Sequence, residues 1–429
     1  MMIKTIYYFL NNMKYVILLF ICFLNPKTAI SQTFNDSICF DLNKFSSDSL
    51  EIRDLRSYGF PISDGNSVQL FTNGHDKFVD MFEHINKAEK FIHLEYFNFR
   101  NDSINSVLIN ILHEKVKQGV EVRVIYDAFG NSSNNRPIKK EKHDSIAKLG
   151  IQIQKFDPIR FPWANHLTRD HRKIVVVDGI YAYTGGMNVA DYYIDGLEGI
   201  GVWRDMHMRI KGPAVNDIHH IFADMWAKQT GFLLSGAKYF PVPVIDGEDK
   251  VAIINRQPNI SNKAIRQLYI SMLNNAKESV KIISPYFAPT TTIRKAIADA
   301  INRGVEVQIM VSEKGDIPLT PETSLYVAHA FMKKGAVVYI YKKGFNHSKI
   351  MIVDDKFCTI GSANLNSRSI RFDLEINTVV FGEKTTRRMV EIFELDKKDS
   401  YILDNENWKK IGKWKRTVGW FGNFLTPFI

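Results

Sequence analysis

Two segments of this chain carry the same polar pattern, H-x-K-x4-D, and a Gly-x-x-Asn begins seven residues after each Asp. Four polar positions at one spacing, occurring twice, indicate a duplicated chain in which the two histidines share one site. The pattern consists of His171, Lys173, Asp178 and Asn188 in its first copy, and of His347, Lys349, Asp354 and Asn364 in its second.

The residue types in this pattern suit chemistry on an anionic, tetrahedral group such as phosphate. A histidine titrates near neutral pH and can act as a nucleophile or as a general acid. A lysine beside it supplies a compact positive charge, and an asparagine adds neutral hydrogen-bond donors for phosphate oxygens. The Asp has two interpretations that the sequence leaves open: it takes part in catalysis, or it caps the turn that follows the apolar run.

Similar secondary-structure patterns surround both copies. The segment Lys117–Ile125 matches Asn302–Met310, and each follows a stretch with helical periodicity (107–116 and 293–301). Each match predicts a helix that ends at a glycine and leads into a buried strand. Strand–helix–strand order in both halves predicts an α/β fold built twice, with a boundary near 239–249, where prolines and a glycine interrupt the pattern.

The doubled motif resembles the signature of the phospholipase D superfamily, and the likeness covers roughly residues 66 to 420. Four flanking segments make the chain most similar to the bacterial cardiolipin synthases: Ile92–Tyr96, Trp203–His207, Ser284–Pro289 and Gly361–Ser369. The resemblance implies two phospholipase D-like α/β sandwich repeats that form a pseudo-twofold pair, with the active site between them.

The resemblance also implies a mechanism. One motif histidine attacks the phosphodiester phosphorus and forms a phosphohistidine, while the other protonates the leaving alcohol and then deprotonates the incoming hydroxyl. We assign His171 as the nucleophile and His347 as the acid and base; because the two motifs are nearly symmetric, the reverse order is the alternative. No metal and no other cofactor is expected, because the two lysines and a histidinium supply the cationic charge. The expected phosphate-binding residues are Lys173, Lys349, Asn188 and Asn364, and the motif aspartates Asp178 and Asp354 are grouped with the catalytic residues.

A nucleophilic imidazole needs an acceptor on its other nitrogen, which fixes the tautomer and stabilises the cation. In the family a carboxylate downstream of each motif has this role. The matching residues are Asp205, 34 residues after His171, and Glu375, 28 residues after His347. The alternative for each carboxylate is an ordinary salt bridge to a neighbouring arginine.

The N-terminal segment 1–31 has the features of a secretory signal peptide. Lys4 and Lys14 precede an apolar stretch from Tyr15 to Leu24, and small residues lead to a cleavage site before Gln32. The alternative is an uncleaved membrane anchor. Either version predicts an exported protein, in the periplasm or on the outer face of the cytoplasmic membrane. The predicted organisation continues with an adaptor segment at 32–65, repeat 1 at 66–240 and repeat 2 at 241–429, which includes a basic aromatic tail.

The charge favours an anionic membrane surface as the partner. Removing residues 1–31 deletes three lysines and no acids, so the formal net charge falls from +10 to +7. Such a charge attracts anionic phospholipids such as phosphatidylglycerol. In the tail, tryptophans alternate with lysines from Trp408 to Trp420, which suits a headgroup boundary; alternatively, a basic helix packs these tryptophans on repeat 2. The sequence carries no prediction of oligomeric state.

Three functions are compatible with the motifs. The first is a phosphatidyltransferase that makes cardiolipin from two phosphatidylglycerol molecules and releases glycerol. The second is a secreted phospholipase D that hydrolyses phospholipid to phosphatidic acid, with water as the acceptor. The third is a phospholipase D-type nuclease, because positive charge also suits nucleic acid. The flanking segments and the exported N-terminus favour lipid over nucleic acid.

Overall fold

The computed structural model describes residues 49–429 except 134, 158–167 and 427–429. The predicted signal peptide or anchor and the first part of the predicted adaptor lie outside the described residues. Within the part that the structure describes, no helix is both long and apolar enough to cross a membrane.

Repeat 1 begins after a short helix, α2 (Leu50–Ser57), and alternates strands with helices. Its elements are β1 (Ile62–Phe71), α3 (Gly74–Asn86), β2 (Phe91–Tyr96), α4 (Ser103–Lys117), β3 (Glu121–Asp127), α5 (Ala128–Ser132), α6 (Lys140–Lys148), β4 (Gln152–Phe156), β5 (Lys173–Val177), β6 (Tyr181–Gly185), α7 (Tyr192–Asp195), β7 (Val202–Arg204), β8 (His207–Lys211) and α8 (Ala214–Thr230).

Repeat 2 follows the same order and adds the C-terminal helices. Its elements are β9 (Asp249–Arg256), α9 (Ala264–Asn275), β10 (Ser279–Ile283), α10 (Thr291–Asn302), β11 (Glu306–Ser312), α11 (Thr320–Met332), β12 (Val337–Tyr341), β13 (Gly344–Asn346), β14 (Ile350–Val353), β15 (Phe357–Gly361), α12 (Ser367–Arg371), β16 (Glu375–Phe381), α13 (Glu383–Lys398), β17 (Ser400–Ile402), α14 (Asn405–Lys410) and α15 (Lys413–Leu425).

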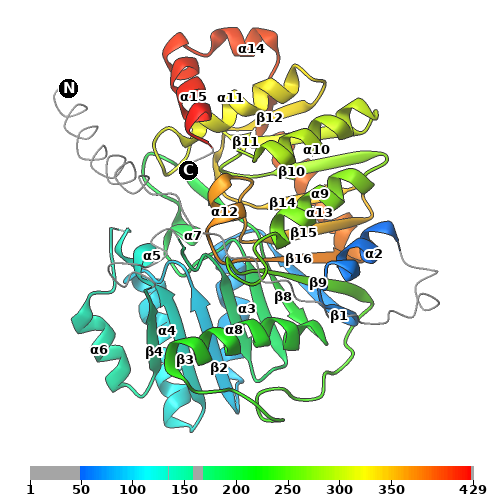
Figure 1. Cartoon of the computed structure of the whole chain (residues 1–429). Helices are drawn as coiled ribbons and strands as arrows, with labels where there is room; N and C mark the ends of the chain where they lie inside the picture. The colour runs from blue at the N-terminus through cyan, green and yellow to red at the C-terminus, as the bar shows by residue number, and fades with distance from the viewer. Residues whose placement is uncertain (1–48, 134, 158–167, 427–429) are drawn as a thin grey trace, which may run out of the picture. The chain divides into compact units, whose positions relative to one another are not determined.

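The described strands of both repeats form one continuous sheet (Figure 1), apart from the separate pair β7 and β13. Its order is β17-β12-β11-β10-β14-β15-β16-β9-β1-β8-β6-β5-β2-β3-β4, and the repeats meet where β1 pairs antiparallel with β9. Reading outward from that junction, β8-β6-β5-β2-β3-β4 corresponds to β16-β15-β14-β10-β11-β12. The predicted duplicated α/β fold is therefore confirmed, with both motifs on central strands.

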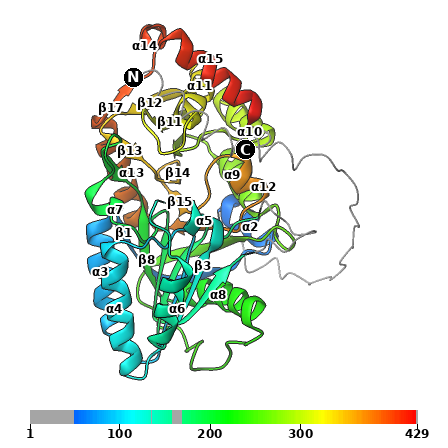
Figure 2. The same cartoon turned by 90° about the vertical axis from the view of Figure 1, so that its left-hand side faces the viewer.

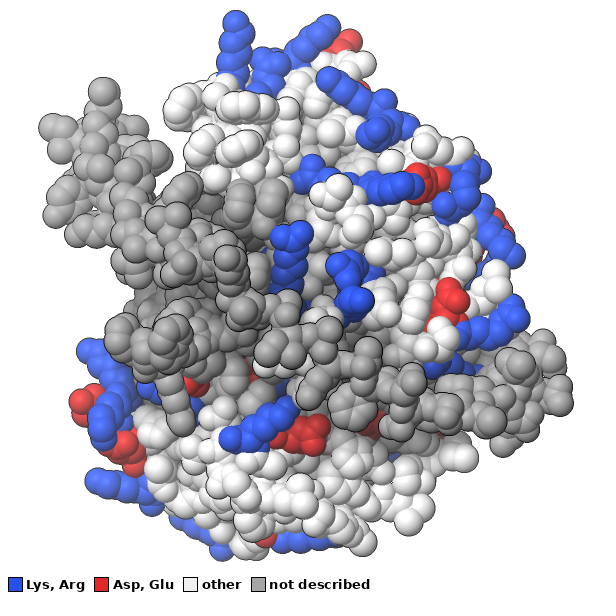
Figure 3. Space-filling view, viewed as in Figure 1, with Lys and Arg blue, Asp and Glu red and all other residues white. Residues whose placement is uncertain are grey.

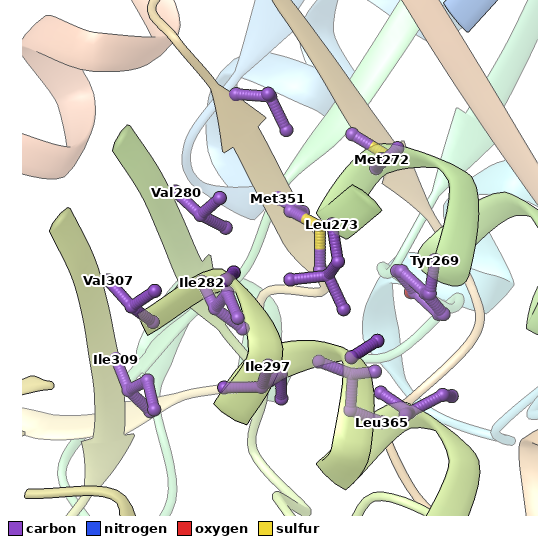
Figure 4. Packing of buried hydrophobic residues seen from close by; sticks show 14 of the residues in the cluster. Tyr269, Met272, Leu273, Val280, Ile282, Ile297, Val307, Ile309, Met351 and Leu365 are labelled. Atoms are coloured by element: carbon purple, nitrogen blue, oxygen red, sulfur yellow. The ribbon is translucent and has the colours of Figure 1, made fainter. Parts of the chain in front are cut away.

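The central strands are buried along their whole length because helices cover both faces of the sheet. All six residues of β2 and all five of β5 are buried, as expected for strands covered on both sides. The helices bury one face each: in α10, the residues Ile293, Ala296, Ile297 and Ala300 recur at helical spacing and are all buried. Figure 4 shows this face of α10 packed with residues of α9, β10, β11 and β14 in the core of repeat 2.

A further apolar cluster draws residues from both repeats. It contains Ile174 and Val176 of β5 together with Ile350 and Ile352 of β14, and it includes residues of α8 and α13. Alternate residues of each motif strand therefore belong to this shared core. The apolar run inside each motif therefore has a structural role: it packs the motif strand into a core that both repeats share.

The first helix of the described chain, α2, packs against repeat 2. Its Glu51 and Asp54 carboxylates accept hydrogen bonds from Ser271 and Asn275 of α9. Burial raises the pKa of Glu51 to about 7, and the two hydrogen bonds offset part of that shift. The end of the predicted adaptor is thus built into the fold, and β1 begins at Ile62, within the segment that was predicted to precede repeat 1.

Candidate active site

Each histidine segment pairs with backbone of the opposite repeat. In one place, β13 runs parallel to β7, so that Asn346 faces Arg204, and the His347 amide donates to the Arg204 carbonyl at 2.6 Å. In the other, Asp170 forms an isolated parallel bridge with Leu374, whose carbonyl accepts from the His171 amide at 3.0 Å. These two equivalent backbone contacts between the repeats bring the two motifs to one site.

The two orienting carboxylates are exchanged in the same way. The Nδ1 atom of His171 lies 3.1 Å from both carboxylate oxygens of Glu375, and the Nδ1 atom of His347 lies 2.7 Å from Oδ2 of Asp205. Both carboxylates are fully buried. The structure brings both predicted carboxylates to the histidines, but the predicted pairing is wrong: each carboxylate contacts the histidine of the other repeat and not the histidine upstream of it. A proton shared on Nδ1 leaves each Nε2 free to react.

The second residue of each Gly-x-x-Asn segment lies against one of these carboxylates, and it differs between the repeats. The Ser362 hydroxyl donates to Oε2 of Glu375, and the Ile376 amide donates to that hydroxyl at 3.0 Å. The equivalent position is Gly186, where a Cβ atom would lie 2.2 Å from Oδ1 of Asp205. The shorter Asp205 side chain therefore approaches the backbone at a place where only glycine fits, which explains why serine is missing from the first motif.

We predict that Gly186→Ala disables the site without removing any polar group. The new methyl group must displace the Asp205 carboxylate, which then no longer holds the ring of His347. A misplacement of about 1 Å at a catalytic group costs on the order of 100-fold in rate, so kcat for phosphodiester turnover should fall by about that factor. Ser362→Ala is the matched control, because it removes one hydroxyl without steric conflict and should cost far less. Equal activity of Gly186→Ala and the wild-type protein would contradict this role.

The two motif lysines are buried and point their ammonium groups at the site. The Lys173 and Lys349 ammonium groups each donate to the carbonyl of the histidine two residues earlier. Burial lowers the pKa of Lys173 to about 7 and that of Lys349 to about 8, although nearby carboxylates offset part of both shifts. A bound phosphate group would favour the charged form of both lysines. The expected phosphate-binding role therefore fits their surroundings.

Burial favours the neutral form of both imidazoles. Burial lowers the pKa of His171 to about 4, and Glu375 offsets only part of this shift, while Lys173 and Lys349 increase it. Burial and the neighbouring Lys349 also lower the pKa of His347. Burial would raise the pKa of Glu375, but its contacts with His171, Lys173 and Ser362 bring it below the usual value. A neutral imidazole beside an ionised carboxylate is the form that attacks phosphorus.

The two motif asparagines lie in the buried region just past β6 and β15. Oδ1 of Asn188 accepts from the Asn98 amide at 3.1 Å, and its Nδ2 donates to the Tyr193 hydroxyl at 3.1 Å. Oδ1 of Asn364 is buried and has no hydrogen-bond partner among the described residues. The side chain of Asn188 is held in place by its surroundings, and binding of phosphate oxygens by both asparagines stays a prediction.

The motif aspartates are not brought to the site, so their grouping with the catalytic residues is corrected. The Asp178 carboxylate accepts three backbone amides, from Glu89, Lys90 and Phe91, each at 2.8 Å. Asp354 does the same for the amides of residues 277–279. Both lie at the far ends of the motif strands and have positive φ, 54° and 52°. They cap the segment that leads into the neighbouring strand, β2 or β10. Their role is structural, as the other interpretation of the sequence held, but they cap this segment and not the turn that follows the apolar run.

We predict that Asp178→Asn and Asp354→Asn lower stability rather than the catalytic constant. Asparagine tolerates the positive φ but loses the charge that strengthens three amide hydrogen bonds, at a cost of about 1–3 kcal/mol. Thermal unfolding should shift to lower temperature, while kcat per folded molecule stays near the wild-type value. A loss of kcat at a temperature where the variant is fully folded would restore a catalytic role for these residues.

Sequence reasoning missed the aromatic surroundings of the histidines. The Phe97 ring centroid lies 4.9 Å from that of His171, and the rings of Trp203 and Tyr286 lie 5.3 and 5.9 Å from His347. All three belong to or adjoin segments that carry the family resemblance, but an aromatic residue at a strand end more often signals core packing.

Comparisons with known proteins show which family this chain resembles in sequence. The family model described as "Cardiolipin synthase, PLD-like domain" matches residues 81–226 and 269–397. A cardiolipin synthase of Geobacillus sp. (strain WCH70) is 34% identical over 373 residues, which are 86% of this chain and 74% of the relative. Cardiolipin synthase 2 of Staphylococcus epidermidis is 34% identical over 368 residues, which are 85% of this chain and 75% of the relative.

Solved structures share the fold at low sequence identity. The phosphatidylserine synthase of Haemophilus influenzae Rd KW20 covers 88% of this chain and all of its own, with a TM-score of 0.66 and 14% identity. The polyphosphate kinase of Porphyromonas gingivalis covers 88% of this chain and 53% of its own, with a TM-score of 0.54 and 13% identity. Two repeats in one sheet, crossed histidine–carboxylate pairs and this sequence similarity lead to one conclusion: the chain belongs to the cardiolipin synthase family of phospholipase D-like enzymes.

Proposed function

We propose that this chain transfers a phosphatidyl group from one phosphatidylglycerol molecule to another, which forms cardiolipin and releases glycerol. The observation that supports this most strongly is the pair of neutral histidines, each held by a buried carboxylate of the opposite repeat. Transfer between two alcohols needs one group that protonates the leaving alcohol and later deprotonates the acceptor alcohol, and a second group that holds the phosphatidyl intermediate. A pair of histidines provides both groups. The names of the relatives supply the lipid class.

In the first half-reaction, Nε2 of His171 attacks the phosphorus of the donor lipid. The bond from phosphorus to the glycerol headgroup oxygen breaks, and His347 gives that oxygen its proton. The product is a phosphatidyl-histidine and free glycerol. Because burial lowers the pKa of His347, the negative phosphate and Asp205 must together favour its protonated form when substrate binds. Lys173 and Lys349 stabilise the charge on the nonbridging oxygens in the transition state.

In the second half-reaction, His347 takes the proton from a glycerol hydroxyl of the acceptor lipid. That oxygen attacks phosphorus, and the bond between phosphorus and His171 breaks. The electron pair returns to Nε2, and the Glu375 carboxylate stabilises the imidazolium until this happens. The product is cardiolipin, and the two histidines return to their starting states. Phosphorus binds one oxygen for each one that it releases, so no cofactor has to supply electrons.

We further propose that the reaction takes place on an anionic membrane surface at the outer face of the cytoplasmic membrane. The positive net charge supports the membrane surface, and the predicted signal peptide or anchor supports the exported location. Attachment of a membrane-impermeant reagent to surface lysines in intact cells tests the location. Labelling only after the cells are broken would contradict export.

The test of the function is incubation of the purified enzyme with phosphatidylglycerol vesicles, with glycerol, phosphatidic acid and cardiolipin followed over time. Equal amounts of glycerol and cardiolipin are expected, and added chelator should leave the rate unchanged. Phosphatidic acid without cardiolipin would show that water is the acceptor. Cleavage of single-stranded DNA without lipid turnover would show a nuclease instead. A Gly186→Ala sample under the same conditions controls for contaminating lipases.

A further inference from the structure

The C-terminal helix α15 turns aromatic side chains towards solvent. Trp414, Trp420, Phe421 and Phe424 are 75%, 56%, 50% and 66% exposed. The spacing of Trp414, Phe421 and Phe424 places these three residues on one helical face. Single exposed apolar residues are common on protein surfaces, but an aromatic face on a helix that begins with Lys413, Lys415 and Arg416 is the pattern of helices that lie in a membrane interface.

The opposite face of α15 explains why the aromatics point outward. Gly419 and Gly422 lie against α11, where a Cβ atom would come within 2.4 Å of the Glu322 carbonyl and 1.9 Å of the Thr323 hydroxyl. The small residues therefore allow close helix–helix contact, and the large ones are left outside. The alternative raised by the sequence, in which the tail packs its tryptophans on repeat 2, holds for Trp408, which stacks on His329 at 3.6 Å. It does not hold for Trp414.

A pocket of about 610 Å³ opens between α11, α14 and α15. It combines cations, from Lys333, Lys413 and Arg416, with the aromatic rings of Tyr326, Trp408 and Trp420. Among the described residues, no carboxylate lies within ion-pair distance of these three cations. His329 also lines the pocket, and its buried Nε2 has no hydrogen-bond partner in the described chain.

The charge around the pocket is mainly positive. Figure 3 shows several Lys and Arg side chains, with a smaller acidic group among them, over the end of the molecule where α14 and the start of α15 lie; Glu406 is the acidic residue of α14. The basic residues of these two helices are Lys409, Lys410, Lys413, Lys415 and Arg416. A second copy of the chain would bring the same positive charge to this face, whereas an anionic surface complements it.

We propose that α15 lies in the interface of an anionic bilayer, with the phosphate of a lipid headgroup in the pocket between α11, α14 and α15. This site is separate from the paired histidines, and it rests on the proposed function only for the lipid class. The aromatic face enters the boundary between headgroups and acyl chains, and Lys333, Lys413 and Arg416 neutralise the phosphate. The pocket thereby fixes the depth and orientation at which the enzyme meets its substrate.

The position of α15 connects this surface with the active site. The C-terminal half of α15, which contains Gly419 and Gly422, packs on the start of α11. The loop just before α11 carries Asp316, which accepts from the Tyr286 hydroxyl at 2.6 Å, and the Tyr286 ring stands beside His347. In both views, α15 runs towards the side of the molecule where α12 follows the second motif (Figures 1 and 2). An interfacial α15 would therefore hold the bilayer next to the site that consumes its lipids.

The test measures amide hydrogen exchange across residues 413–425 in the full chain, since this readout is local and independent of any N-terminal anchor. Vesicles of phosphatidylglycerol should slow exchange there at least tenfold, and phosphatidylcholine vesicles much less. The double variant Lys333→Gln/Arg416→Gln should need about 30-fold more phosphatidylglycerol for the same effect, at about 1 kcal/mol for each lost cation near the surface. The control Lys139→Gln/Lys148→Gln removes equal charge from the region of α6 and should behave as wild type.

The outcomes separate this proposal from the proposed function. Phe421→Ser/Phe424→Ser should lose activity on vesicles but keep wild-type turnover of monomeric short-chain phosphatidylglycerol. Unchanged exchange across α15 on phosphatidylglycerol vesicles would overturn the proposal even if cardiolipin is made. Equal protection by inorganic phosphate alone, or by raised protein concentration without lipid, would also overturn it, in favour of a free anion or a second copy. Protection of α15 without any cardiolipin formation would leave this proposal standing and reject the function.

Discussion

Replacing either motif histidine by alanine is expected to lower kcat for cardiolipin formation by about 10⁴-fold or more. The estimate follows from other covalent enzymes, in which loss of the nucleophile or of its base has such an effect. Both half-reactions need both imidazoles, so His171→Ala and His347→Ala should be similarly inactive. The double variant should be no worse, because groups that act as one unit are not additive. Initial rates on phosphatidylglycerol vesicles measure the loss.

The control for this prediction is His75→Ala, which removes an exposed imidazole from α3. It should retain wild-type activity, and the thermal unfolding of all variants should stay close to that of the parent protein. Substantial activity in either motif variant, when folded, would show that its histidine does not belong to a shared site.

The second large effect concerns the crossed carboxylates. Glu375→Gln and Asp205→Asn keep size and shape but remove the charge that holds each imidazole, and kcat should fall by about 10²- to 10⁴-fold, by analogy with the aspartate of a serine-protease triad. The crossing itself is tested by the ring resonances of the two histidines. Glu375→Gln should shift those of His171, and Asp205→Asn those of His347. The reverse assignment would contradict the exchange between repeats.

Glu375→Gln should also move the pH dependence of kcat/KM. Burial lowers the pKa of Lys173 to about 7, and Glu375 keeps it from falling further. Removing the carboxylate charge destabilises the ammonium form, so the pKa of Lys173 falls and its charge is lost at lower pH. The basic limb of the profile is therefore expected to shift to lower pH. The exposed Glu278→Gln is the matched control and should leave the profile unchanged.

The parts of this account that depend on local patterns could be read from the sequence. Apolar periodicity and glycine positions predicted α4 and α10 and the strands that follow them, because burial of one helix face and the positive φ of Gly119 and Gly304 are local requirements. The duplication could be recognised because two repeats with the same fold need apolar residues and glycines at equivalent positions. The motif identified both lysines and both histidines, and the structure places these four together.

The remaining features depend on contacts that no periodicity encodes. The crossing of Asp205 and Glu375 arises from backbone pairing between segments more than 140 residues apart, at β7 with β13 and at Leu374 with the His171 segment. The structural role of Asp178 was left open because its partners are backbone amides, which every residue type offers. The need for glycine at 186 follows from the shorter reach of Asp205 compared with Glu375, which becomes apparent only once the carboxylate is placed.

The central claim is that two halves of one chain build a single site around one phosphorus atom. Rapid quenching in a mildly alkaline denaturant during turnover of phosphatidylglycerol labelled at phosphorus with ³²P, followed by peptide mapping at alkaline pH, tests it directly. The account predicts at most one acid-labile phosphatidyl group per chain, attached to His171 and absent from the His171→Ala variant. Two labelled histidines per chain, or a labelled residue outside the two motifs, would contradict it.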